Sequence, residues 1–160
     1  MTGFANLADG GAQLVPEVRA RVSALAHPCL LAIMPNGVPV AEPIADALGL
    51  PLLAAPLDRD DEPMVGALPD VAGRAVVVVD DGVETGTAAR LVGEAARSAG
   101  AAYLLLAVPV CPREAMPAME RVYDAVIALD RPLVRRNLRW HFADFDTIDQ
   151  PEAQRRLDAR

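Results

Sequence analysis

The stretch VVVVDDGVETGTA, residues 76–88, places a run of four valines directly before two carboxylates and a Thr-Gly-Thr turn. Consecutive β-branched apolar residues are typical of a strand that is buried on both faces of a parallel sheet. The polarity changes at Asp80, where such a strand would reach the carboxyl edge of the sheet, and ligands of open α/β sheets bind at that edge. This stretch therefore predicts both the class of fold and the place of a ligand site.

The residues that follow the valines have the chemistry of a sugar-phosphate site. Asp80 and Asp81 can accept hydrogen bonds from a vicinal diol or hold a hydrated Mg²⁺. The backbone N–H groups of residues 84–88 could surround a phosphate dianion at the start of the next helix. Together these groups favour a ribose 5-phosphate. The alternative is an ordinary strand and capped helix, in which Asp80, Asp81 and Thr85 are only turn and cap residues.

The segment resembles the 5-phosphoribosyl-1-pyrophosphate (PRPP) binding motif of the type I phosphoribosyltransferases. Three further stretches are similar in order and spacing to a bacterial phosphoribosyltransferase-like group: FANLADGGAQL (4–14) to its opening helix, AIMPNGVPV (32–40) to its pyrophosphate loop and WHFADF (140–145) to its hood. The resemblance implies an α/β fold with a mostly parallel sheet flanked by helices. It also implies one domain over residues 1–160, with a small carboxy-terminal hood near 131–149.

The resemblance implies transfer of ribose 5-phosphate from PRPP to a nitrogen-containing acceptor, such as a nucleobase, with release of pyrophosphate. Asp80 and Asp81 would hold the ribose hydroxyls and stabilise the charge at the anomeric carbon, and Mg²⁺ would be bound there mainly through PRPP and water. The 5-phosphate would be fixed by the turn Glu84, Thr85, Gly86, Thr87 and Ala88. A homodimer is the family expectation. Two alternatives stay open: a PRPP- or nucleotide-binding regulator without chemistry, and a nucleotide or phosphate-ester hydrolase with Glu84 as its base.

Two loops depart from the family pattern. The turn Pro35-Asn36-Gly37 could bind pyrophosphate through its amides, although the family carries a basic residue there and a plain turn has the same composition. Residues 57–73 fall where the family places a mobile loop that closes over the reaction. Arg59 is the only cation in that loop and a candidate catalytic residue, but a solvated acidic loop is the alternative because its neighbours are Asp58, Asp60, Asp61 and Glu62.

Glu84 is unusual, because many relatives have threonine or alanine at this point of the phosphate turn. A carboxylate beside a bound phosphate lowers affinity unless a cation or proton intervenes. Purine phosphoribosyltransferases resemble this chain in having an acid before Thr-Gly, where it handles the proton of the incoming base. We therefore hypothesise that Glu84 is a general base or hydrogen-bond acceptor, and the rival hypothesis is a site retuned away from PRPP.

The aromatic residues gather near the carboxy terminus. Trp140, Phe142 and Phe145 lie within six residues, together with His141. A flat acceptor could stack on Trp140 or Phe142 while His141 reads its edge. The alternative is that these side chains only seal the core.

Composition limits the remaining classes. The chain has 160 residues, 52% hydrophobic and 23% charged, which is ordinary for a soluble globular protein, and the sequence shows neither a membrane span nor a secretory signal, so we expect a cytoplasmic location. The net charge of −7 argues against nucleic acid as the main partner. All 15 basic residues are arginine. Cys29 and Cys111 are expected to be buried free thiols.

The alternation of apolar patterns predicts a doubly covered parallel sheet. We expect helices over 9–25, 40–48, 85–98, 112–121 and 150–157, and strands over 29–34, 52–55, 74–80, 102–110 and 124–129.

Overall fold

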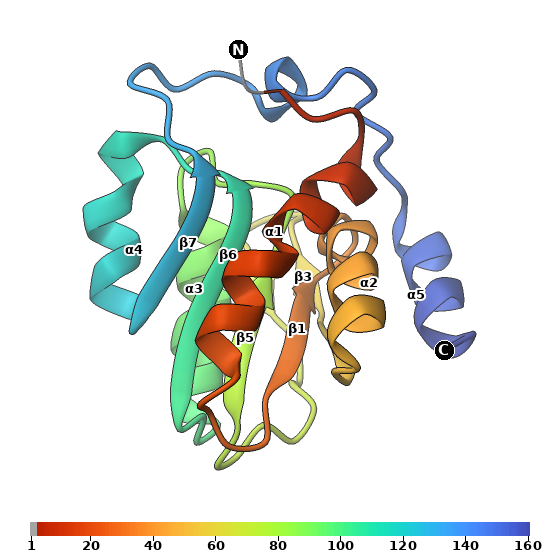
Figure 1. The fold of residues 1–160 in the computed structure, drawn as a ribbon, viewed down its shortest axis with the longest axis vertical. Coiled ribbons are helices and arrows are strands. Elements are labelled where there is room, and N and C mark those ends of the chain that lie inside the picture. Colours follow the sequence, from red (N-terminus) through yellow and green to blue (C-terminus); the bar gives the residue numbers. More distant parts are fainter. Residues whose placement is uncertain (1–2) are drawn as a thin grey trace.

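The computed structural model describes residues 3–160, in which a five-stranded parallel sheet is covered by helices on both faces (Figure 1). The strand order is β2-β1-β5-β6-β7, with β5 in the centre. The strands are β1 (Cys29–Ile33), β2 (Leu52–Ala55), β5 (Ala75–Val79), β6 (Tyr103–Val110) and β7 (Ala125–Asp130). The helices are α1 (Leu7–Val22), α2 (Gly37–Leu48), α3 (Thr87–Ser98), α4 (Met116–Val122) and α5 (Gln150–Asp158). None of the helices within residues 3–160 has the length and apolar character needed to cross a membrane.

The central strand β5 is buried at all five positions, as its run of valines predicts. Val77 and Val79 face the core beneath α1 and α2, whereas Val76 and Val78 face the core beneath α3. Neighbouring β1 and β6 are buried in the same way, with only Tyr103 at the start of β6 partly exposed. The buried apolar strands fix the sheet, and their carboxyl ends meet at one edge. Cys29 and Cys111 are buried free thiols, as expected.

Every predicted helix and strand is present with ends that differ by a few residues, and the local backbone explains the observed starts of α1 and α3. Helix α1 begins at Leu7, because the Asn6 side chain accepts a hydrogen bond from the Asp9 N–H at 2.8 Å and caps the helix there. Helix α3 begins at Thr87 rather than residue 85, because Gly86 has a left-handed backbone with φ of 88°. A short 3₁₀ turn, η1 (Arg113–Ala115), precedes α4.

Two elements were not predicted. Residues 57–73 contain a short antiparallel hairpin of β3 (Leu57–Asp58) and β4 (Met64–Val65), whose two-residue strands are too short to give a periodic signal. The hood segment, residues 131–149, contains a 3₁₀ turn, η2 (Leu138–His141). Both elements lie next to the carboxyl edge of the sheet, so both matter for the site.

The hood segment is tied to the amino-terminal part of the chain, and Figure 1 shows the two lying together at the top of the molecule. The Phe4 N–H donates to the His141 carbonyl at 3.0 Å, and the Ala143 N–H donates to the Phe4 carbonyl at 2.8 Å. The Phe142 ring lies 5.4 Å from that of Phe4 and 5.4 Å from that of Phe145. These long-range contacts hold the hood over the carboxyl edge of the sheet.

Candidate active site at the carboxyl edge of the sheet

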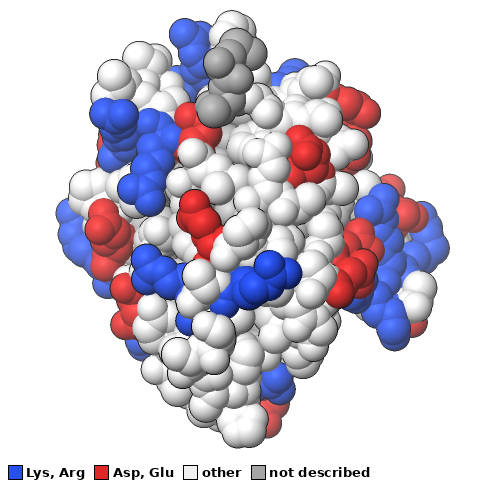
Figure 2. All heavy atoms as spheres, viewed as in Figure 1, with Lys and Arg blue, Asp and Glu red and all other residues white. Residues whose placement is uncertain are grey.

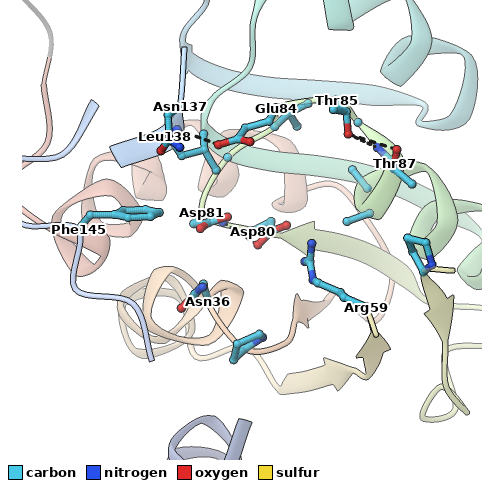
Figure 3. A pocket seen from close by; sticks show the side chains of 17 residues that line it. Asn36, Arg59, Asp80, Asp81, Glu84, Thr85, Thr87, Asn137, Leu138 and Phe145 are labelled. Carbon is cyan, nitrogen blue, oxygen red and sulfur yellow. Dashed lines mark hydrogen bonds between the residues drawn. The ribbon is translucent and has the colours of Figure 1, made fainter. Parts of the chain in front are cut away.

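A cavity of about 710 Å³ lies at the carboxyl edge of the sheet, beneath the hood segment. Its walls come from the end of β5, the start of α3, the loop before α2, the β3–β4 hairpin and the hood. Figure 3 shows the side chains that line it, among them Asn36, Arg59, Asp80, Asp81, Glu84, Thr85, Thr87, Asn137, Leu138 and Phe145. The structure therefore brings three predicted parts, the acidic pair, the phosphate turn and the pyrophosphate loop, to one cavity.

Asp80 and Asp81 form a buried acidic pair directly after β5. Their exposed fractions are 6% and 8%, and the Asp81 N–H donates to the Asp80 carboxylate at 2.9 Å. Burial, together with the charge of Asp81, raises the pKa of Asp80 well above its usual value. Burial also raises the pKa of Asp81. Two carboxylates held this way favour a ligand that donates hydrogen bonds or brings a cation, because either would compensate their buried charge.

Arg59 faces this acidic pair. Its side chain points from the hairpin toward Asp80 (Figure 3), and its positive charge lowers the pKa of both carboxyl groups, against the effect of burial. Among the described residues that line the cavity, Arg59 is the only one with a basic side chain. The hairpin thus carries the cation of the site, and its exposed position leaves it free to meet an anionic ligand.

The phosphate turn ends in an open helix terminus. Gly86 precedes α3 with φ of 88°, and as the N-cap residue it offers no side chain to cap this helix. The two flanking hydroxyls meet each other, with the Thr85 and Thr87 Oγ1 atoms 3.2 Å apart, and the Thr87 N–H lies at a long 3.4 Å from the Thr85 hydroxyl (Figure 3). Thr87, Ala88 and Ala89 of the first turn of α3 line the cavity, and the N–H groups of a helix start are suited to an anion.

The pyrophosphate loop lies against the end of β5. A Cβ on Gly37 would lie 2.5 Å from the Val79 carbonyl oxygen, so only glycine allows this approach. Pro35 and Asn36 line the cavity, whereas Gly37 is buried behind them. The Asn36 side-chain carbonyl accepts a hydrogen bond from the Ile148 N–H at 2.9 Å. Asn36 thus joins the loop to the hood, a role that the sequence did not indicate.

Glu84 also joins the hood to the sheet edge. Its carboxylate accepts a hydrogen bond from the Leu138 N–H at 2.9 Å. The Leu138 side chain packs on Gly82, where a Cβ would lie 2.5 Å from the Leu138 Cδ2 atom. One oxygen of Glu84 is therefore engaged by the hood backbone, and the carboxylate acts as a hydrogen-bond acceptor in the structure.

The hood side chains that we expected to face an acceptor lie elsewhere. Trp140 is 64% exposed and its ring lies 4.5 Å from the Arg136 guanidinium carbon. The His141 Nδ1 atom lies 3.2 Å from the Asp130 carboxylate, and Phe142 packs in the aromatic cluster that seals the hood. The physical reason is the turn η2, which directs Leu138 to the cavity and Trp140 to solvent.

The hood residues that line the cavity are instead Asn137, Leu138 and Phe145. Phe145 belongs to the aromatic group that the sequence singled out, so that group contributes one ring to the cavity. Leu138, an apolar residue among arginines in RRNLRW, was the available signal for an inward-facing position. Asn137 is marked by its capping role, since its side chain accepts from the Arg139 N–H at 2.9 Å.

Comparison with known proteins identifies the family. Residues 24–129 match the family model described as the phosphoribosyl transferase domain. The chain belongs to this family. Two Mycobacterium tuberculosis proteins whose names class them with the phosphoribosyl transferases are 31% identical over 88 residues, which is 55% of this chain and 20% of theirs. The chain thus spans about a fifth of the length of these curated relatives.

Solved structures confirm the fold. Protein TT1426 of Thermus thermophilus superposes with a TM-score of 0.83 at 21% identity, covering 97% of each chain. A purine phosphoribosyltransferase of Pyrococcus horikoshii gives a TM-score of 0.58 at 18% identity, covering 85% of this chain and 100% of the other. An adenine phosphoribosyltransferase of Thermoanaerobacter pseudethanolicus gives 0.60 at 14% identity, covering 76% and 80%. The predicted type I phosphoribosyltransferase fold is therefore confirmed.

Proposed function

We propose that this chain transfers ribose 5-phosphate from PRPP to a nitrogen-containing acceptor and releases pyrophosphate. The observation that carries the proposal is the buried pair Asp80 and Asp81 in the same cavity as the start of α3, whose N-cap residue is a glycine. The purine and adenine phosphoribosyltransferases that share the fold support an acceptor of nucleobase type. A homodimer in the cytoplasm is the expectation that accompanies this proposal.

The reaction is a substitution at the anomeric carbon. The bond from that carbon to a pyrophosphate oxygen breaks, its electron pair leaves with pyrophosphate, and the acceptor nitrogen forms the new bond and gives up its proton to a base, for which Glu84 is the candidate. The acidic pair holds the ribose hydroxyls and stabilises the positive charge that develops at the carbon. Residues 84–88 fix the 5-phosphate, so the carbon is presented to the acceptor at a defined position. Arg59 in the hairpin faces the leaving group.

The residues present fit a magnesium ion that is bound mainly by substrate. Within residues 3–160, no group of three or more histidine, cysteine or acidic side chains is arranged to hold a metal. Asp80 and Asp81 offer two hard oxygen ligands, which is the usual protein share at a Mg²⁺ site where phosphates and water complete the shell. The ion, when bound, neutralises charge on pyrophosphate.

A regulator that binds PRPP without consuming it is the second possibility, and one observation favours it. Arg59 is surrounded in sequence by Asp58, Asp60, Asp61 and Glu62, whose charges oppose a departing pyrophosphate. Calorimetric titration with PRPP, with and without Mg²⁺, tests the shared binding step, using ribose 5-phosphate and nucleoside monophosphates as controls. Mg²⁺-dependent binding followed by pyrophosphate release with a nucleobase panel supports transfer. Binding without release identifies the regulator, and no PRPP binding refutes both.

Glu84 gives a separate prediction about positioning. Glu84→Gln keeps a carbonyl oxygen for the Leu138 N–H but removes the charge beside the phosphate, so we expect tighter PRPP binding and an unchanged KM for the acceptor. Glu84→Ala removes the hydrogen bond as well, and a lost hydrogen bond of about 1–1.5 kcal/mol predicts a KM for the acceptor that is roughly 5- to 13-fold higher. Steady-state kinetics on both variants checks this.

Glu94→Ala is the control for the Glu84 variants, because Glu94 is an exposed carboxylate on α3 whose Arg90 partner lies on the same helix. If Glu84→Gln lowers kcat as strongly as Glu84→Ala, the carboxylate acts as a general base and its positioning role is not the main one.

A further inference from the structure

A second cavity lies on the hood side of the phosphate turn. Its volume is about 250 Å³, and it is lined by Glu84, Thr85, Arg135, Arg136 and Asn137. Three of these residues, Glu84, Thr85 and Asn137, also line the first cavity, so the two cavities share a wall. The transfer reaction proposed above makes no use of the two arginines.

Two of the five residues that line this second cavity are arginines, and one is acidic. The only carboxylate among the lining residues is Glu84, and one of its oxygens already accepts the Leu138 N–H at 2.9 Å. Thr85 and Asn137 add a hydroxyl and an amide, which can donate hydrogen bonds. Two arginines and one engaged carboxylate give the lining residues a net positive charge.

The guanidinium groups are largely available. Arg135 lies 3.6 Å from Glu114, and both side chains are about half exposed, so this ion pair is screened by water and easily exchanged. Arg136 is stacked on the Trp140 ring at 4.5 Å, and it makes no ion pair with the described residues. Stacking orients the planar guanidinium while its N–H groups stay free, which suits recognition of a phosphate.

The local charge contrasts with that of the whole chain. The chain carries a net charge of −7, yet the nine residues RPLVRRNLR, 131–139, hold four arginines and no acid. Figure 2 shows basic side chains gathered at the upper left, where Figure 1 places the start of the hood segment. A positive patch on an acidic protein attracts small anions to this place in preference to the rest of the surface.

We propose that the second cavity is a phosphate-binding site separate from the 5-phosphate position at the start of α3, although the two share Glu84 and Thr85 as a wall. It takes the phosphate group of a small molecule through the guanidinium groups of Arg135 and Arg136. The volume is below that of a site that encloses a whole nucleotide, so the cavity holds the phosphate and the rest of the ligand lies outside it. The exposed face of Trp140 beside Arg136 offers a surface for a flat group attached to that phosphate.

The chain has one tryptophan, so its fluorescence reports on this site. We would titrate the protein with inorganic phosphate, ribose 5-phosphate and adenosine monophosphate at constant ionic strength and record Trp140 emission. A saturable change is expected, because an anion at Arg136 alters the charge over the indole ring. Arg135→Gln keeps the Arg136–Trp140 stack, and it should raise the ligand concentration at the midpoint by about 10-fold, since a charge-assisted hydrogen bond is lost. Arg121→Gln, an exposed arginine of α4 outside both cavities, should leave the midpoint unchanged.

Any one of these results overturns the proposal: no saturable change, a change reproduced by sodium chloride, or an unaltered midpoint in Arg135→Gln. A response that persists in Arg135→Gln but is lost in Gly86→Ala would assign the signal to the phosphate turn and also overturn it. Equal midpoint concentrations for phosphate and adenosine monophosphate identify a site for the free ion. A lower midpoint concentration for the nucleotide identifies a phosphate ester stacked on Trp140. The readout needs no turnover, so failed PRPP binding would refute the proposed function and leave this site standing.

Discussion

Replacing Asp80 and Asp81 together by asparagine is expected to abolish transfer and to raise the free energy of unfolding. Activity is lost because asparagine cannot stabilise the positive charge at the anomeric carbon, and removing such a preorganised group costs on the order of 10²- to 10³-fold in kcat or more. The free energy of unfolding rises because the variant no longer buries two charged groups. The two carboxylates are only 6% and 8% exposed, and desolvation costs on the order of 1–3 kcal/mol for a buried polar group. A variant that loses activity but gains stability marks a functional site rather than a structural one.

The gain in stability depends on pH, and its sign follows from the raised pKa values. Burial raises the pKa of both carboxyl groups in the folded chain above the usual value of 3.8. The folded state therefore holds protons that the unfolded state has lost, so the free energy of unfolding falls as pH rises above 3.8 toward the raised pKa. The asparagine variant lacks this fall. We expect its advantage over the wild type to grow with pH through that window and then to level off.

Urea denaturation of both proteins over a pH series measures this difference. The matched control is Asp60→Asn with Asp61→Asn, an adjacent acidic pair of the hairpin that is exposed to solvent. The control should show no comparable gain. A control stabilised to the same extent would mean that the gain comes from the lower net negative charge and not from burial. An asparagine variant at Asp80 and Asp81 that is less stable than the wild type at neutral pH would mean that the buried charges are compensated within the protein itself.

The sequence predicted the parts of the site that are local in the chain. Asp80, Asp81 and the turn at residues 84–88 follow one strand, and the geometry of a parallel sheet carries them to its carboxyl edge whatever the rest of the chain does. The same reasoning located Pro35 and Asn36 after β1. Arg59 was noted as the loop cation, although the hairpin that aims it at Asp80 was not predicted.

The hood could not be predicted in the same way, because long-range contacts decide its inward face. Glu84 meets Leu138 across 54 positions, and Asn36 meets Ile148 across 112. Aromatic content drew attention to Trp140, but the turn η2 directs that ring to solvent and presents Leu138 instead. Which side of a short irregular segment faces inward depends on partners that the local pattern does not contain.

Gly86→Ala is expected to weaken binding of ribose 5-phosphate by about 5- to 30-fold. Gly86 has φ of 88°, a backbone conformation that costs an L-residue about 1–2 kcal/mol. The added Cβ would also lie 2.9 Å from the Met119 Cε atom, although that flexible side chain can move away. The turn relieves the strain by rotating its peptide planes, and the first N–H groups of α3 then point away from the phosphate. Calorimetry with ribose 5-phosphate measures the loss.

Gly49→Ala separates this loss from a general effect of backbone strain. Gly49 ends α2 with φ of 64°, and no heavy atom lies within 4 Å of the place where its Cβ would stand. Alanine there carries a similar conformational cost, about 1 kcal/mol, but alters no group of the cavity. We expect both variants to lose stability and only Gly86→Ala to lose ribose 5-phosphate. If Gly49→Ala weakens binding equally, the phosphate turn does not hold the 5-phosphate, and the anion that this fold binds would have to be sought at the arginines of the hood.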